Sequence, residues 1–221
     1  MHRMAASPSP LPAARVAVLD RVRRGDHSVN ALALALGITD NAVRLHLAAL
    51  VRDGLVWRRG VRHSGRAGQP AAEYGLAVAG EIALSAAYAP ALTALVWALA
   101  HETDPGAARA LYAAAGKRLA ASTPARRSGS LAARAGACAA LVESLGGTAR
   151  VSTARGETTL VGAGCPLSVA VRADGAACTI IESLLAEHSG LRVVQRCEHG
   201  EHGEHGEHGE HPACRFVLTE P

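Results

Sequence analysis

Three segments near the start of the chain carry apolar residues at the spacing of an amphipathic helix. In the first, residues 12–24, Val16, Leu19 and Val22 share one face while the arginines lie largely off it. Gly25 and Asp26 then break the pattern. The pattern therefore predicts a first helix that ends before residue 25.

Two further helices are predicted after it, separated by a tight turn. Ser28 is placed to cap the second helix, which ends at the turn residue Gly37. The third helix covers residues 41–52 and is capped by Thr39 or Asp40. Its apolar positions recur at i, i+4 and i+7: Val43, Leu47 and Leu50. This spacing of helix, glycine-containing turn and helix predicts a helix-turn-helix.

Two short apolar stretches after the third helix indicate a β-hairpin. Residues 55–57 form the first strand, and the alternation resumes at residues 74–76. The segment between them contains glycines and a run of basic residues without one acid: Arg58, Arg59, Arg62, His63 and Arg66. The sequence thus predicts a basic wing beside the helix-turn-helix.

A long and almost wholly apolar segment follows the hairpin. Residues 81–101 are expected to be helical, with apolar residues on too many sides for a lone surface helix. Such a helix fits a dimer interface or an ordinary core within the domain. Asp104 and Pro105 have the character of an N-cap and first residue of the next helix, and residues 131–145 predict another.

The last third of the chain combines strand and helix patterns. Residues 148–161 alternate as two strands with a turn at Gly156, and residues 177–189 predict a helix. Residues 191–197 form a strand whose antiparallel partner is expected at residues 214–219. These elements predict a small α+β module.

The patterns together predict a mainly helical protein with α+β parts. Four segments are expected: a disordered lead-in over residues 1–11, a winged helix-turn-helix DNA-binding domain over 12–80, a helical linker and dimerisation region over 81–147, and a cysteine-containing α+β sensor domain over 148–221.

The composition agrees with this picture and excludes several functions. Alanine is abundant and only 3% of the residues are aromatic, which favours helices. No apolar run reaches the roughly 18 residues of a membrane span, and residues 1–12 lack the apolar core of a secretory signal. A cytoplasmic location is therefore expected. No phosphate-binding glycine loop, nucleophile–base set or H-E-x-x-H motif is present, so we do not expect an enzyme.

Charge is distributed unevenly along the chain. Residues 1–66 contain eleven arginines and four aspartates, whereas residues 178–221 contain three arginines and eight glutamates. A double-stranded DNA partner at the N-terminal end is the simplest use of this asymmetry. The candidate DNA-binding residues lie at the start of the third helix and along the wing: Thr39, Asn41, Arg44, Leu45, His46, Arg58, Arg59, Arg62 and Arg66.

Four of the five cysteines fall at the ends of predicted elements in the last third of the chain: Cys165, Cys178, Cys197 and Cys214. No C-x-x-C pair occurs, so the pattern is not that of a zinc finger or ribbon. Widely spaced thiols from different elements suit an iron–sulfur cluster, although unrelated reduced cysteines would have the same spacing. Cys138 lies between alanines in a predicted helix and is expected to be a buried apolar residue.

A Glu-His-Gly repeat occupies residues 198–211. Such a tract does not pack into a core, and it is expected to form a loop between two strands. The alternative is a metal-binding function, because a period of three places its histidines along one side of an extended chain.

The segments "LALALGITDNAVRLHLAALVRDGLVWRR" and "GRAGQPAAEYGLA" resemble the ArsR-like winged-helix regulators. More narrowly, they resemble the branch typified by the iron–sulfur-cluster biosynthesis repressor SufR, although Gln69 stands where that branch has an arginine. The pattern of "CPL", a helix-borne cysteine and "C…HG…CRF" is similar to the cysteine pattern of the same branch.

This resemblance implies a homodimeric repressor in which Cys165, Cys178, Cys197 and Cys214 hold a [2Fe–2S] or [4Fe–4S] cluster. Loss or gain of the cluster would then control operator binding. Three alternatives remain open: a zinc- or nickel-binding regulator, a thiol-redox regulator without a cluster, and a regulator that binds a small ligand.

Overall fold

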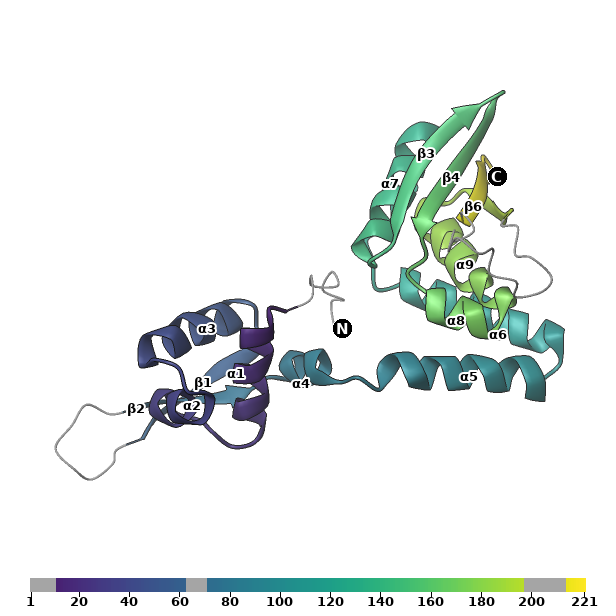
Figure 1. Cartoon of the computed structure of the whole chain (residues 1–221). Coiled ribbons are helices and arrows are strands. Elements are labelled where there is room, and N and C mark those ends of the chain that lie inside the picture. Colours follow the sequence, from purple (N-terminus) through teal and green to yellow (C-terminus); the bar gives the residue numbers. More distant parts are fainter. Residues whose placement is uncertain (1–10, 63–70, 197–213) are drawn as a thin grey trace, which may run out of the picture. The chain divides into compact units, whose positions relative to one another are not determined.

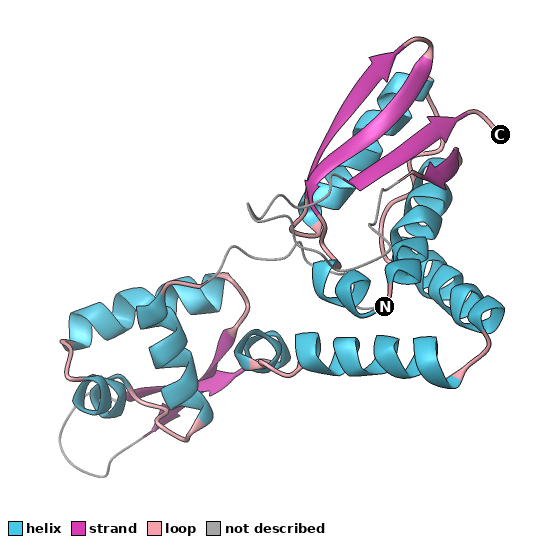
Figure 2. Cartoon of the chain, turned by 45° about the vertical axis from the view of Figure 1, so that its right-hand side comes forward, coloured by secondary structure: helices cyan, strands magenta, loops and turns pink. Residues whose placement is uncertain are grey.

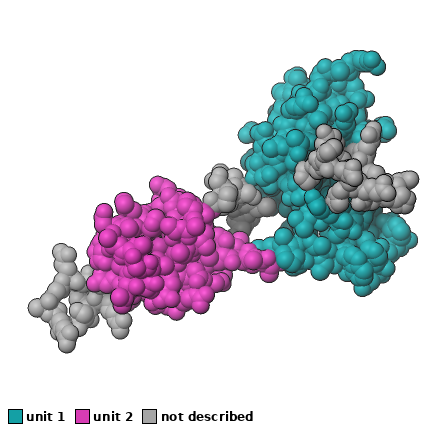
Figure 3. Space-filling model, in the orientation of Figure 1, with its two compact units in different colours: residues 1–7, 88–221 teal, residues 8–87 magenta. Residues whose placement is uncertain are grey.

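The computed structural model describes residues 11–62, 71–196 and 214–221. These residues form two compact units that divide between Ala87 and Tyr88 (Figure 3). Helices predominate, and each unit also contains one small antiparallel sheet (Figure 2). The protein is therefore a mixed α+β protein, as the sequence predicts. Most of the expected lead-in, residues 1–10, lies outside the described residues.

The N-terminal unit begins with three helices, α1 (Ala13–Arg23), α2 (Val29–Leu36) and α3 (Asp40–Arg52) (Figure 1). Ser28 caps α2 and Thr39 caps α3, because each hydroxyl oxygen accepts a hydrogen bond of 3.2 Å from the backbone N–H three residues later. Both caps lie where the sequence predicts them.

Gly37 ends α2 in the left-handed conformation, with a φ of 65° that favours glycine. The chain turns there, so that the axes of α2 and α3 are inclined by 113°. The three helices enclose one apolar core, whose fully buried members are Val18, Leu19, Val22, Leu32, Val43, Leu47 and Leu50.

The inward face of α1 differs from the sequence-based expectation. Val18 is fully buried beside Leu19 and Val22, whereas Val16 is 39% exposed. The helical spacing allows either valine to join Leu19 and Val22, and the packing of α2, α3 and β2 on α1 selects Val18.

A two-stranded antiparallel hairpin follows α3, formed by β1 (Val56–Arg62) and β2 (Ala71–Leu76). Its pairing shifts between Arg58 and Gly60, which leaves Arg59 as an extra residue on β1. A short helix, α4 (Val78–Leu84), completes the N-terminal unit.

The single helix expected over residues 81–101 is divided in the structure. The first part belongs to α4, which ends at Leu84, and a separate helix, α5 (Tyr88–Glu102), begins the C-terminal unit. Pro90 explains the break. Proline is tolerated in the first turn of a helix, but inside a continuous helix it has no N–H to donate and its ring clashes with the carbonyl group four residues earlier. The apolar pattern alone continues through the break.

Two more helices follow in the C-terminal unit, α6 (Pro105–Ala120) and α7 (Leu131–Ser144). Asp104 caps α6, since its carboxylate accepts from the backbone N–H groups of Gly106 and Ala107 at 2.9 and 3.1 Å. This is the N-cap and proline start that the sequence predicts. Both helices pack within the C-terminal unit, and they do not form a separate region over residues 81–147.

A four-stranded antiparallel sheet with the order β3-β4-β6-β5 also belongs to this unit. Its strands are β3 (Thr148–Ala154), β4 (Glu157–Gly164), β5 (Arg192–Gln195) and β6 (Cys214–Thr219). The expected pairing of the last two strands is confirmed, with Gln195 opposite Phe216.

Between β4 and β5 the chain forms α8 (Ser168–Ala173), a 3-10 turn η1 (Gly175–Ala177) and α9 (Cys178–Ser189). Helices α7 and α9 pack against the same face of the sheet (Figures 1 and 2). Gly190 ends α9 in the left-handed conformation.

A second, smaller apolar cluster joins α5, α6, α8 and the start of α9. Its buried members include Val96, Tyr112, Ala170 and Ile180. The loop that carries Cys165 and the first turn of α9 thus lie between this cluster and the main core of the sheet.

Candidate nucleic-acid interface and cysteine pocket

The first turns of α3 present an exposed polar surface. Asn41 and Arg44 are exposed, and Leu45 is 66% exposed. His46, which the sequence analysis also selects, is only half-buried. The opposite face of α3 carries Val43, Leu47 and Leu50 into the core, so the outward residues are held on a rigid element.

Thr39 has a different role at the same end of α3. Its hydroxyl oxygen accepts a hydrogen bond from the backbone N–H of Ala42 and thereby caps the helix. It is exposed, so its position at the helix start also leaves its hydroxyl hydrogen able to donate to another group.

Most aspartates of the N-terminal unit are paired with arginines away from this surface. Asp20 pairs with Arg23 and Arg24, and Asp53 pairs with Arg15 and Arg52. The hydrogen bond from Arg24 is the largest of several contacts that lower the pKa of Asp20.

Three other arginines of the unit have no acidic partner among the residues that the structure describes: Arg44, Arg58 and Arg59. Arg44 lies on α3, and the other two lie on β1. The positive charge that remains uncompensated is therefore carried by these two elements, where a polyanion would neutralise it.

The hairpin holds Arg59 in a defined position. Its guanidinium lies over the half-exposed ring of Trp57 at 6.0 Å, and its Nη1 lies 3.3 Å from His27 Nε2. Gly75 opposite makes room for the indole, since a Cβ there would lie 2.9 Å from the Trp57 ring. Trp57 and His27 are contacts that the sequence analysis did not select.

Two further predicted wing residues lie at and beyond the end of β1. Arg62 is the last residue of β1, and Arg66 lies outside the described residues, together with His63.

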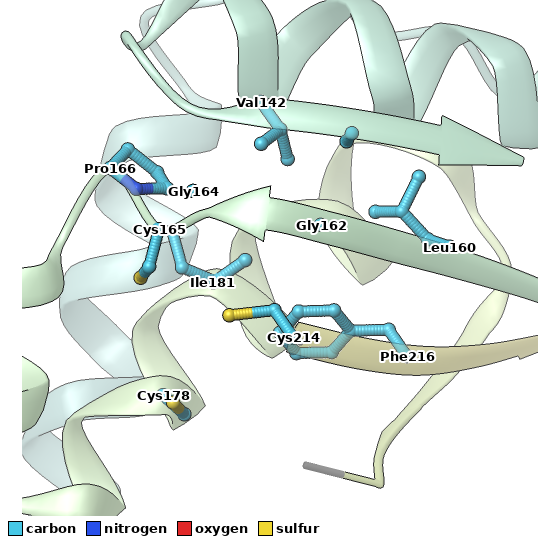
Figure 4. A pocket seen from close by; sticks show the side chains of 11 residues that line it. Val142, Leu160, Gly162, Gly164, Cys165, Pro166, Cys178, Ile181, Cys214 and Phe216 are labelled. Carbon is cyan, nitrogen blue, oxygen red and sulfur yellow. The ribbon is translucent and has the colours of Figure 1, made fainter. Parts of the chain in front are cut away.

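In the C-terminal unit, three of the four selected cysteines line a single pocket (Figure 4). Cys165 follows the end of β4, Cys178 is the first residue of α9, and Cys214 is the first residue of β6. The fourth, Cys197, lies outside the described residues, as does the Glu-His-Gly repeat.

The local structure around each thiol explains its placement. The backbone N–H of Leu167 donates to Cys165 Sγ at 3.4 Å. Gly162 is paired with Cys214 on the neighbouring strand, where a Cβ would lie 3.3 Å from the Cys214 Cβ. In Figure 4 the sulfur of Cys214 points toward the side of the pocket that bears Cys165 and Cys178.

The rest of the pocket wall is apolar and includes Val142, Leu160, Pro166, Ile181 and Phe216. The cavity has a volume of about 20 Å³, which is room for about one water molecule. Among the described residues, no three His, Cys, Asp or Glu side chains form an arrangement that holds a metal ion. The three described thiols therefore share one small apolar pocket.

Cys138 is separate from the pocket lining. It is fully buried in α7, and its Sγ lies 4.0 Å from the carbonyl oxygen of Leu185. Burial raises the pKa of its thiol, which keeps it protonated. Its burial in the apolar core agrees with the sequence-based expectation.

A hydrogen-bonded tyrosine of the C-terminal unit was not selected from the sequence. The Tyr112 hydroxyl donates to Asp174 Oδ2 at 2.9 Å and lies 3.2 Å from the carbonyl oxygen of Val96 on α5. Asp174 in turn caps η1, the turn that leads directly into Cys178. The sequence carries no signal for this contact, because its two side chains are 62 residues apart.

No protein-family model matches this chain, and a search of curated proteins gave no match. No single helix in the described part of the chain is both long and apolar enough to cross a membrane, although two pairs of consecutive helices meet that test when joined.

Proposed function

We propose that this protein is a transcriptional regulator that binds double-stranded DNA through α3 and the β1–β2 hairpin. The observation that carries the proposal is the geometry of α2 and α3. Their inclination of 113° across a short glycine turn is that of a helix-turn-helix, in which the second helix enters the major groove. With the hairpin, the unit has the order of elements of a winged helix-turn-helix.

The residues assigned to DNA follow from this placement. Arg44 and Asn41 project from the first half of α3, where guanine and adenine edges are the matching partners of arginine and asparagine. Leu45 adds an apolar contact of the kind made with a thymine methyl group. Arg58 and Arg59 on the hairpin are suited to phosphate contacts, which position the protein without reading sequence.

A binding experiment with a matched pair of variants tests the DNA assignment. Preferred duplexes are first selected from a random pool with the purified protein, and affinities are then measured by fluorescence anisotropy. Arg44→Ala is expected to weaken binding by about 10-fold or more, because a base-contacting arginine contributes about 1–3 kcal/mol.

Arg52→Ala is the control, because Arg52 is an exposed arginine on the same helix that is paired with Asp53. It should leave the affinity within about two-fold. Equal losses for the two variants, or the absence of any selected sequence, would contradict the assignment of α3 as the reading helix.

We further propose that the C-terminal unit is the sensor of this regulator, and that its thiols hold an iron–sulfur cluster. The donor chemistry fits, since three thiols from three different elements line one apolar pocket. Cys165, Cys178 and Cys214 would be ligands, with Cys197 as the fourth. The group would supply a redox-sensitive centre, and the protein would act as a repressor whose DNA affinity follows the state of that centre.

Anaerobic purification with iron, sulfide and absorption measurements tests this assignment. Visible absorption with matched iron and sulfide is expected, and Cys178→Ala should lower the bound iron strongly. Cys138→Ala is the matched control, because Cys138 and Cys178 are both buried but only Cys178 lines the pocket. Equal iron content in the two variants and the unaltered protein would exclude Cys178 as a ligand.

The size of the cavity favours a second candidate for the sensor. With room for about one water molecule, the pocket suits a single zinc or nickel ion or a thiol oxidation better than a preformed cluster site. A colourless protein that binds stoichiometric zinc, or whose thiols react with oxidant without bound metal, would establish this alternative and leave the DNA assignment unchanged.

A further inference from the structure

The guanidinium of Arg59 is held in place by other side chains, although the residue itself is exposed. Arg59 is the extra residue at the point where the pairing of β1 with β2 shifts, and such a bulge re-aims the side chain that it carries. Its guanidinium carbon lies over the indole of Trp57, 6.0 Å from the ring centroid. Gly75 leaves room for both side chains, because a Cβ there would lie 2.9 Å from the Trp57 indole nitrogen and 3.0 Å from Arg59 Cδ. The ring and the stem of the arginine therefore lie over the same glycine of β2.

His27 supplies a second contact to Arg59 from the segment between α1 and α2. Its Nε2 lies 3.3 Å from Arg59 Nη1, and this imidazole nitrogen is the acceptor, because a guanidinium has only donors. The other ring nitrogen of His27, Nδ1, is buried and has no hydrogen-bond partner among the described residues. The backbone of His27 is fixed as well, since its carbonyl oxygen accepts from the Tyr74 N–H at 2.8 Å and the next residue, Ser28, caps α2. The acceptor that Arg59 meets thus belongs to a rigid part of the unit.

These contacts leave most of the hydrogen-bonding capacity of the guanidinium unused. His27 accepts from one of five N–H groups, and the stacking on Trp57 uses none of them. In the described part of the chain no carboxylate pairs with Arg59, and the acid next to His27 in sequence, Asp26, is paired with Arg21. The remaining donors of Arg59 are therefore available to an anion from outside the protein, and phosphate matches their fork geometry.

The adjacent arginine on the same strand lacks this support. Arg58 is exposed, and among the described residues no hydrogen bond, ion pair or aromatic ring holds its side chain. A phosphate contact by Arg58 would have to order a long side chain at the moment of binding, which opposes association. The side chain of Arg59 is ordered before DNA arrives, so the same contact is more favourable there.

We propose that His27 and Trp57 are positioning residues, which hold Arg59 ready for a contact with one backbone phosphate of bound DNA. This assignment rests on the proposed DNA binding by the hairpin. It adds two residues outside the predicted set and an order of importance between two neighbouring arginines, in which Arg59 contributes more than Arg58. His27 acts only through its hydrogen bond to the guanidinium, so its effect on DNA affinity requires the arginine to be present.

A double-mutant cycle on the full chain tests the positioning. His27→Leu and Arg59→Ala are made singly and together, and the affinity for the selected duplex is measured by fluorescence anisotropy at one salt concentration. His27→Leu is expected to weaken binding by about 3- to 10-fold, because a released arginine must be ordered on binding, and Arg59→Ala by at least as much. In the Arg59→Ala background, His27→Leu should have no further effect. His27→Gln, whose side-chain oxygen can accept in place of Nε2, should keep most of the affinity.

Arg58→Ala is the matched control for the loss of one positive charge, and it should weaken binding less than Arg59→Ala. Equal losses for these two variants would overturn the inference. The same loss from His27→Leu with and without Arg59 would also overturn it, because a purely structural effect does not depend on the arginine. Either result leaves DNA binding itself intact, since Arg44→Ala reports on the reading helix in the same assay. A protein that selects no duplex would overturn both proposals.

Discussion

At the scale of single residues, Gly116 determines how closely α6 and α9 pack. A Cβ at this position would lie 2.3 Å from the carbonyl oxygen of Ile180 and 3.0 Å from the Leu184 nitrogen, both of which are backbone atoms of α9. Because the Ile180 oxygen is a backbone atom, it cannot move aside as the end of a flexible side chain could. The two backbones can therefore approach only because residue 116 has no side chain.

Gly116→Ala is accordingly expected to destabilise the C-terminal unit by about 1–3 kcal/mol, the usual cost of forcing an extra carbon into a packed site. Urea unfolding followed by circular dichroism measures this change. Gly136→Ala is a matched control on α7, where a Cβ would meet no atom within 4 Å. It should stabilise the protein by roughly 0.5–1 kcal/mol through helix propensity, so effects of the same sign would refute the packing argument.

His188 is a second residue whose surroundings have a measurable consequence. It is 6% exposed near the end of α9, and its Nδ1 has no hydrogen-bond partner. Burial, with a smaller contribution from the positive charge of Arg126, lowers its pKa below the ordinary value of 6.5. The folded protein thus favours the neutral imidazole.

The sign of the pH dependence follows from this direction. The contribution of His188 to stability is present above about pH 6.5 and is lost as the pH falls through the lower pKa of the folded state. Urea unfolding at about pH 7.5, 6.5 and 5.5 should therefore show a smaller loss of stability in His188→Gln than in the unaltered protein. His101→Gln, at an exposed histidine, should keep the loss unchanged. Identical pH dependence in all three proteins would contradict the buried neutral state.

At the scale of elements, Tyr112 connects three helices. It lies on α6, its hydroxyl donates to Asp174 between α8 and η1, and the carbonyl oxygen of Val96 on α5 lies 3.2 Å away. Burial and the hydrogen bond with Asp174 raise its pKa to about 12. The same side chain therefore links α5 to the segment that leads into Cys178.

Tyr112→Phe is expected to destabilise the C-terminal unit by about 1–2 kcal/mol, because it removes a hydrogen bond to a carboxylate and keeps the ring. It should also abolish the tyrosinate absorbance change that occurs near pH 12 in the unaltered protein. Tyr88→Phe, at an exposed tyrosine, serves as the control for both measurements and should leave the stability unchanged. If the two variants had the same stability, the hydrogen bond between Tyr112 and Asp174 would make no net contribution to the free energy of unfolding.

The elements that local signals define are the ones that the sequence predicts well. Ser28, Thr39 and Asp104 cap their helices as expected, because capping depends on residues three positions apart. The break between α4 and α5 was missed, because an apolar segment continues through it and its cause, Pro90, lies inside the new helix.

The cysteine pocket could be predicted only in part for a related reason. The ends of elements, where Cys165, Cys178 and Cys214 lie, are visible in the sequence. Their approach to one pocket depends on the strand order β3-β4-β6-β5, which brings β6 beside β4 although α8, η1, α9 and β5 separate them in sequence. Long-range pairing of this kind leaves no local pattern.

At the scale of the whole molecule, the chain consists of two units with separate cores. Val18, Leu47 and Leu50 belong to the core of the N-terminal unit, while Leu160 and Leu184 belong to that of the C-terminal unit. The uneven charge of the sequence follows this division, because the arginine-rich residues 1–66 fall within the first part of the chain. If the two proposed functions are combined, the N-terminal unit binds DNA and the C-terminal unit is the sensor.

This division leads to a prediction for the isolated N-terminal unit. Residues 8–87 should fold alone with a cooperative unfolding transition, because their core is complete and includes both strands of the hairpin. Because dimerisation is expected of residues 81–147, which the fragment mostly lacks, the fragment should remain monomeric. It should also bind the selected duplex more weakly, since a second copy no longer adds its contacts.

The salt dependence of binding separates these contributions. The slope of the logarithm of affinity against the logarithm of salt concentration is about −0.9 for each phosphate neutralised. One copy contacts half as many phosphates as two, so the fragment should show about half the slope of the full chain. Leu95→Glu in the full chain provides the control, because it places a charge on the exposed face of α5, within the expected dimerisation region, without removing the C-terminal unit. It should give the same reduced slope. A fragment that keeps the full slope would mean that a single N-terminal unit makes all of the phosphate contacts, and pairing of two copies would then have no part in DNA binding.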